Sequence, residues 1–189
     1  MEKIVRSISI WCGQRVTLEE GEQEYMEYGL YLFIDTVWKY ILIMTMGAMF
    51  GALLETVIIM VEIAIYRIFA GGYHSKTSFG CFFYIGCVCF ASIIFGTVTS
   101  QYLSVNIGMV MYCIVGGMIW KYVPLQSEKN PIKSNKDIRL RKCFSLILVG
   151  ICLLLFHLVE TKIGFILLYG LLIETSCIYI ETKRRGARG

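Results

Sequence analysis

The fold of this chain is decided by residues 77–120, which read TSFGCFFYIGCVCFASIIFGTVTSQYLSVNIGMVMYCIVGGMIW. No Asp, Glu, Lys, Arg or His occurs among them. A helix of about 20 apolar residues crosses the hydrocarbon core of a bilayer, so this stretch is long enough for two spans. A short turn at residues 100–102 would separate spans at 79–99 and 103–120. The sequence therefore predicts an integral membrane protein that contains a helical hairpin.

The composition supports a membrane protein. Hydrophobic residues make up 57% of the 189 residues and charged residues 17%, whereas a soluble domain has about 25% charged residues. The net charge of +4 indicates loops anchored at the inner membrane face and not a nucleic-acid partner. The eight cysteines lack CxxC and zinc-ligand spacing, so we expect buried free thiols and no metal site. Nothing indicates a cofactor.

Two further hairpins are expected. Residues 31–66 would be about 54 Å long as one helix, and Gly47 and Gly51 offer a turn, which favours helices at 31–46 and 52–66. A single tilted helix is the alternative, and it would give five spans. The last hairpin occupies residues 143–159 and 163–180. The predicted fold class is an all-α membrane protein with about six apolar helical segments in three hairpins.

The N-terminal part is expected to lie at the membrane surface. Residues 1–13 have apolar residues at helical spacing and no signal-peptide pattern, which favours an amphipathic surface helix. Thr17 and Glu20 form a capping box that opens an acidic helix. We therefore expect an N-terminal unit at 1–30, followed by a membrane domain at 31–182.

Positive charge sets the expected topology. The hydrophilic loop at 121–142 carries seven basic residues, and the tail at 183–189 is also basic. Cytoplasmic loops are enriched in Lys and Arg, so both segments are expected on the cytoplasmic side. Counting spans backwards from the loop places residues 67–78 and both termini on that side too.

A polar segment precedes the charge-free stretch, where residues 67–81 read RIFAGGYHSKTSFGC. His74 and Cys81 are seven residues apart, or about 10 Å along a straight helix. A nucleophile and its base must approach to about 3 Å, so a continuous helix would keep them apart. Gly71 and Gly72 are expected to end the preceding helix.

A new helix is expected to begin just before the cysteine. Thr77 or Ser78 is suited to cap it, which would place Cys81 in its first turn. A helix N-terminus favours the thiolate, the form of cysteine that attacks. His74 would act as general base, and free backbone N–H groups near Gly80 would stabilise an oxyanion.

The residues alone leave alternatives open. The pair could equally be a loop histidine and a buried thiol. Glu55 and Glu62 share one helical face, so they either line a substrate site or pair with Lys39 or Arg67.

Two stretches carry a family resemblance. Arg67, the run from Phe69 to His74 (FAGGYH) and Cys81 resemble the signature of the AgrB family, the membrane cysteine endopeptidases of bacterial quorum sensing. Residues 121–124 (KYVP) and 130–131 (NP) resemble that family's second landmark, although Val123 stands where the family has alanine. The resemblance extends over essentially the whole chain.

The resemblance implies an activity. Cys81, with His74 as base, would cleave an AgrD-like propeptide through an acyl-enzyme, and a Cys or Ser of the peptide would then close a thiolactone or lactone ring. Arg67, Gly71 and Gly72 would shape the site, and the basic loop would attract the acidic tail of the propeptide. The resemblance further implies a homo-oligomer, such as a homodimer, in the bilayer.

Two other functions are compatible with the same surface. A non-enzymatic peptide exporter or peptide-binding subunit would use it without chemistry at Cys81. A thiol-dependent acyltransferase acting on lipid would instead carry a fatty acyl group on Cys81.

Overall fold

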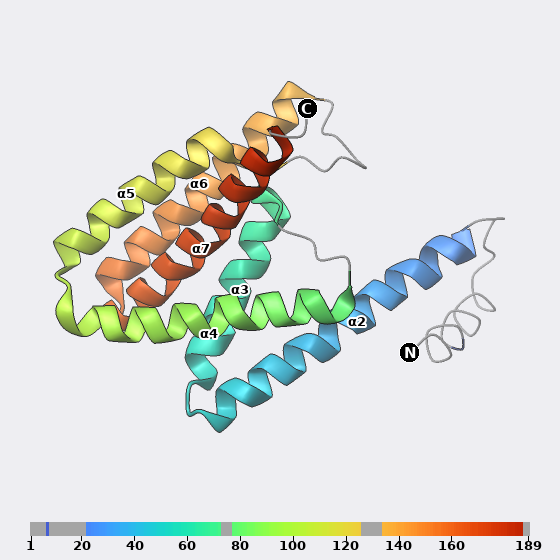
Figure 1. Cartoon of the computed structure of the whole chain (residues 1–189), viewed down its shortest axis with the longest axis horizontal. Coiled ribbons are helices and arrows are strands. Elements are labelled where there is room, and N and C mark those ends of the chain that lie inside the picture. The colour runs from blue at the N-terminus through green and yellow to red at the C-terminus, as the bar shows by residue number, and fades with distance from the viewer. Residues whose placement is uncertain (1–6, 8–21, 73–76, 126–133, 187–189) are drawn as a thin grey trace.

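The computed structural model describes residue 7 and residues 22–72, 77–125 and 134–186. The expected surface helix at 1–13 and the capping box at Thr17 lie outside this described part. Within it the chain is helical, and Figure 1 shows the arrangement. The helices are α2 (Glu22–Met49), α3 (Leu53–Ala70), α4 (Ser78–Tyr102), α5 (Val105–Tyr122), α6 (Asn135–Leu158) and α7 (Thr161–Gly186).

These helices form three hairpins, which confirms the sequence prediction. Between α2 and α3, Gly51 has a φ of +69°, in the left-handed region that favours glycine. The Ala52 N–H then donates to the Gly47 carbonyl at 2.8 Å. A single tilted helix over this region is therefore excluded. The turns at 103–104 and 159–160 are only two residues long.

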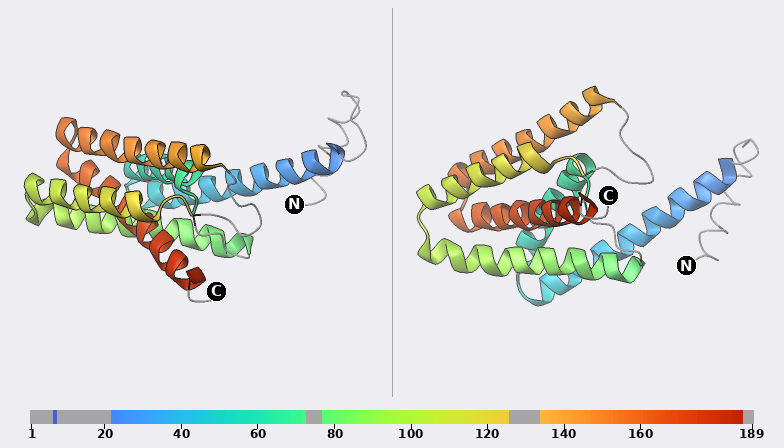
Figure 2. Two further views of the ribbon diagram at one scale, coloured as in Figure 1. Left: turned by 90° about the horizontal axis from the view of Figure 1, so that it is seen from above. Right: turned by 45° about the horizontal axis from the view of Figure 1, so that its top comes forward.

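Helix α2 is longer than the predicted first span. It begins at Glu22 and crosses residue 30 without interruption, so the expected acidic helix and the first span are one element. Gly29 does not break it, because one glycine costs a helix only about 1 kcal/mol. The N-terminal part of α2 projects beyond the other helices (Figure 2).

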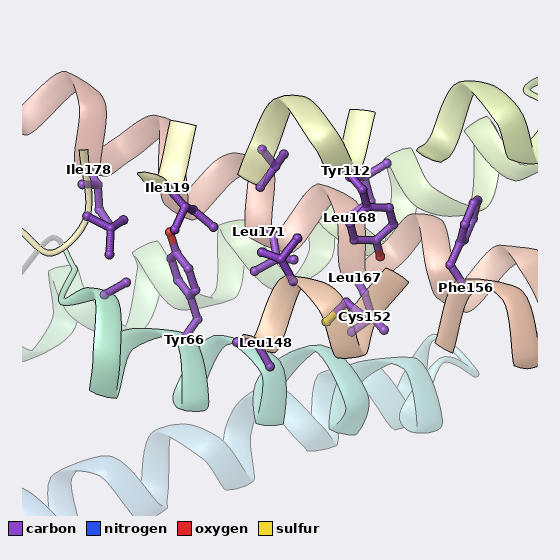
Figure 3. Packing of buried hydrophobic residues seen from close by; sticks show 14 of the residues in the cluster. Tyr66, Tyr112, Ile119, Leu148, Cys152, Phe156, Leu167, Leu168, Leu171 and Ile178 are labelled. Atoms are coloured by element: carbon purple, nitrogen blue, oxygen red, sulfur yellow. The ribbon is translucent and has the colours of Figure 1, made fainter. Parts of the chain in front are cut away.

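Helix α7 lies at the centre of the bundle. It packs against α3, α4, α5 and α6. In its most apolar stretch 56% of the residues are buried, compared with 22–28% in the other apolar spans. Figure 3 shows Leu167, Leu168 and Leu171 of α7 packed among aromatic and aliphatic side chains of its neighbours. Close approach to α4 needs Gly96, where an added Cβ would lie 2.6 Å from the Cα of Ile166.

Helices α3 and α7 run parallel. Their polar contacts follow in the same order along both helices, so the two helices share one direction through the bundle. The contacts are Glu55 Oε1 to Lys162 Nζ at 2.5 Å, Arg67 Nε to Glu174 Oε1 at 3.1 Å, and Tyr66 OH to Thr175 Oγ1 at 2.8 Å.

The described helices are those of a membrane protein. Four of them, α2, α4, α5 and α7, are long and apolar enough to cross a bilayer. Large apolar side chains such as Phe33, Phe95 and Val110 are exposed on the outside of the bundle, where lipid would cover them. The segments after α3 and α5 and the C-terminal end of α7 lie at one end, as the contacts of Leu125 with Ala70 and of Tyr122 with Tyr179 show.

Candidate active site

The first turn of α4 is built as the sequence predicts. Thr77, in extended conformation, is the N-cap, and its side chain accepts a hydrogen bond from the Gly80 N–H at 3.1 Å. The Thr77 carbonyl accepts from the Cys81 N–H at 3.1 Å. Cys81 therefore sits in the first turn of an N-capped helix, half-buried and with a free thiol.

The same hydrogen bonds correct one expectation. The N–H groups of Gly80 and Cys81 are both occupied by Thr77, so neither is open to an oxyanion. The first N–H groups of a helix have no intrahelical carbonyl to donate to. In α4, the backbone N–H groups of Ser78 and Phe79 precede the occupied N–H groups of Gly80 and Cys81.

Asp35 of α2 holds this turn from the side. Its Oδ1 accepts from Ser78 Oγ at 2.5 Å and from Trp38 Nε1 at 3.1 Å. Its other oxygen pairs with Lys39. Lys39 was an expected partner of Glu55 or Glu62, and the structure pairs it with Asp35 instead. Sequence reasoning missed Asp35, although a carboxylate inside an apolar span is itself a signal of an interior partner.

Aromatic side chains pack on one another around the first turn of α4. Trp38 stacks on Phe82 with ring centroids 5.8 Å apart. Tyr40 packs against the same hydrophobic cluster as Cys81.

The end of α3 brings together the two sequence stretches that carry the family resemblance. Gly71 has a φ of +74°, and its N–H closes the helix onto the Arg67 carbonyl at 3.1 Å. The Leu125 N–H donates to the Ala70 carbonyl at 2.9 Å. A Cβ at Gly71 would lie 2.9 Å from the Leu125 oxygen, so this contact requires glycine.

Arg67 joins three parts of the chain. Its Nε donates to Glu174 Oε1 of α7 at 3.1 Å, and its Cζ lies 4.8 Å from the centroid of the Tyr84 ring of α4. A Cβ at Gly72 would lie 3.3 Å from Arg67 Cγ and Nε. The guanidinium is therefore enclosed between α7, α4 and the chain that leaves α3.

The two candidate glutamates of α3 lie elsewhere. Glu55 pairs with Lys162 at the far end of the bundle, twelve positions before Arg67 and so about 18 Å away along the helix. Glu62 is buried against α7, near Gly170. The structure therefore does not bring Glu55 to Cys81, and Lys162 is the partner that sequence reasoning did not find.

His74 lies in residues 73–76, outside the described part, so its distance from Cys81 stays a prediction. An apolar groove of about 190 Å³ runs between α2 and α4, beside Phe82. Its lining residues are Ile43, Met46, Phe82, Phe83, Gly86, Cys87 and Phe90. Among the described residues, no three His, Cys, Asp or Glu side chains gather to hold a metal ion.

Fold and site together define a class: an all-α membrane protein with a cysteine in the N-capped first turn of an apolar helix and a half-buried arginine that contacts the same helix at Tyr84. The chain belongs to the AgrB family, because the family model for accessory gene regulator B matches residues 2–178. It is 28% identical over 166 residues to protein FsrB of Enterococcus faecalis, covering 87% of this chain and 68% of that protein. It is 26% identical over 159 residues to a putative AgrB-like protein of Clostridium perfringens, covering 81% and 74%. No solved structure matches.

Proposed function

We propose that this chain is a membrane cysteine endopeptidase that cleaves an AgrD-like propeptide of quorum sensing and cyclises it into a signalling peptide. Membership of the AgrB family supports peptide processing. The observation that carries the proposal is the position of Cys81, which is half-buried in the first turn of α4. A helix N-terminus favours negative charge, and the thiolate is the attacking form of cysteine.

The reaction has two steps. The Cys81 sulfur attacks the carbonyl carbon of the peptide bond on the C-terminal side of the future ring. A C–S bond forms and the C–N bond breaks, while His74, which took the thiol proton, gives a proton to the leaving amine. A thiol or hydroxyl of the bound peptide then attacks the carbonyl carbon of this thioester. Its proton passes by way of His74 to the Cys81 sulfur. The C–S bond to Cys81 breaks, and the ring is closed as a thiolactone or lactone.

The charges at the Cys81 end of the bundle suit an acidic peptide. Helices α5, α6 and α7 present exposed basic side chains there that outnumber the exposed Asp137 of α6, and a surface of net positive charge attracts and orients an acidic partner. They are Lys121, Lys136, Arg139, Arg141, Lys183 and Arg184. The positive-inside rule places this end, both termini and the site on the cytoplasmic side of the bacterial cell membrane.

Co-expression with the propeptide tests the assignment. Cys81→Ser and His74→Gln are each expected to abolish the cyclic peptide, which mass spectrometry of the medium and cells measures. Cys113→Ser, which alters an exposed cysteine on α5, is the matched control and should retain the product. Cyclic peptide from the Cys81→Ser variant would refute the nucleophile, and a fatty acyl group on Cys81 in the native protein would indicate lipid acyl transfer instead.

A further inference from the structure

Two buried carboxylates face the space between α3 and α7, and they differ in their partners. Glu174 of α7 is 1% exposed, and its Oε1 accepts from Arg67 Nε. Glu62 of α3 is 4% exposed, and within the described part neither of its oxygens has a hydrogen-bond partner. Arg67 is therefore held by a glutamate on another helix, although Glu62 lies five positions earlier on its own.

The ion pair is not explained by stability alone. Removing two charges from water costs several kcal/mol per ion, and apolar residues of similar volume often stabilise a fold as well. What an ion pair with a directed N–H bond adds is geometry. The bond to Glu174 fixes the guanidinium, which in turn lies over the Tyr84 ring, and a Cβ added at Gly72 would lie 3.3 Å from Arg67 Nε.

The residues near Arg67 are close in sequence to Cys81 and to His74, the proposed catalytic pair. Tyr84 lies three residues after Cys81 on α4, so the two side chains share a face of that helix. Gly72 is the last described residue before the segment that contains His74. The Arg67 side chain therefore lies between Tyr84, on the helix that carries Cys81, and Gly72, where the chain leaves α3.

We propose that Glu174 is a positioning residue for the reaction at Cys81. It acts through Arg67, which it fixes against Tyr84 of α4 and beside Gly72 at the end of α3. The inference rests on the proposed function and adds to it a residue more than 90 positions away from the nucleophile in sequence.

The molecule supplies a matched control. Glu55 and Lys162 form a second ion pair between the same two helices, at the end remote from Cys81. Glu55→Gln and Glu174→Gln thus remove the same charge from the same helix pair at opposite ends.

The experiment uses the full-length protein in proteoliposomes with the synthetic propeptide. We expect Glu174→Gln to lower kcat for cleavage by about 100-fold, because an error of about 1 Å in placement costs that much. KM for the propeptide should change by less than about threefold, since the basic surface that binds it is untouched. Glu174→Asp should recover part of kcat, while Glu55→Gln should leave kcat within about threefold of the native value.

A double variant keeps the test decisive if Glu174→Gln unfolds. Arg67→Gln with Glu174→Gln leaves no unpaired buried charge at this position, so the protein is expected to fold while kcat stays low. A native kcat in either variant would overturn the positioning role, as would an equal loss of kcat in Glu55→Gln. If Cys81→Ser still produced cyclic peptide, the proposed function itself would fail, and this outcome is distinct from the others.

Discussion

Gly71 is the residue at which the site depends most directly on backbone conformation. Its φ of +74° is one that side chains rarely adopt, and a Cβ there would also meet the Leu125 oxygen at 2.9 Å. Gly51 has a similar φ of +69° but nothing within 4 Å of the added atom. Substitutions at the two glycines therefore distinguish the cost of backbone strain from the cost of a steric clash.

Gly71→Ala is expected to destabilise the protein more than Gly51→Ala. Strain alone should cost about 1 kcal/mol at Gly51, and the added clash should raise the cost at Gly71 to about 2–3 kcal/mol. Thermal unfolding in detergent measures both. Equal losses for the two variants would show that the contact with Leu125 yields without cost.

Among single residues, local chemistry was predictable from sequence and distant partners were not. Thr77 could be assigned as a cap, and Gly71 as a helix end, because both follow from neighbouring residues. The partners of Ser78 and Arg67 lie 43 and 107 residues away, and no local pattern specifies such pairs. His74 remains a prediction from the motif.

The cap of α4 is the element-scale feature closest to the proposed chemistry. Thr77→Ala should cost about 1 kcal/mol of stability, since the Gly80 N–H loses its acceptor, and it should slow alkylation of Cys81 by iodoacetamide. Thr77→Ser should keep both the stability and the alkylation rate of the native protein. Ser134→Ala is the matched control, because Ser134 caps α6 by accepting from the Lys136 N–H. A Cys81 alkylation rate that falls equally in both alanine variants would contradict a local role for the α4 cap.

Packing between α4 and α7 makes a separate prediction. Gly96→Ala should destabilise the protein by about 1–3 kcal/mol, because the new methyl group overpacks the contact with the α7 backbone. Gly86→Ala on the same helix has nothing within 4 Å and should be neutral or slightly stabilising. Denaturation in mixed micelles compares them, and equal midpoints would mean that α4 shifts on α7 without cost.

At the element scale, hydrophobic runs and glycines located the hairpins. They did not locate the start of α2, because no proline or strong cap separates its acidic and apolar parts. The central place of α7 also could not be foreseen. The apolar spans resemble one another in sequence, so nothing in them marks α7 as the central helix. Its burial against four neighbours is decided by tertiary packing.

Over the whole molecule, the two ends of the bundle differ. One end carries turns of two or three residues, and the other carries the C-terminal ends of α3 and α5 and the first turns of α4 and α6. The α3–α7 pairing in parallel fits an even alternation of the six described helices across a membrane. The cytoplasmic orientation of the Cys81 end is a proposal from the distribution of Lys and Arg.

Cysteine labelling tests that orientation. In a background without the eight native cysteines, Ser104→Cys and Glu160→Cys should react with a membrane-impermeant maleimide in intact cells. Lys136→Cys should react only after the cells are permeabilised, because it lies at the basic end. The reverse pattern would invert the proposed orientation.

The shortness of the turns between α2 and α3, α4 and α5, and α6 and α7 has a practical consequence. In the proposed orientation, an antibody or a protease outside the cell meets almost no chain to recognise. A compound directed at Cys81 has to cross or dissolve in the bilayer first. Blocking this protein is therefore a problem of membrane permeation before it is one of affinity.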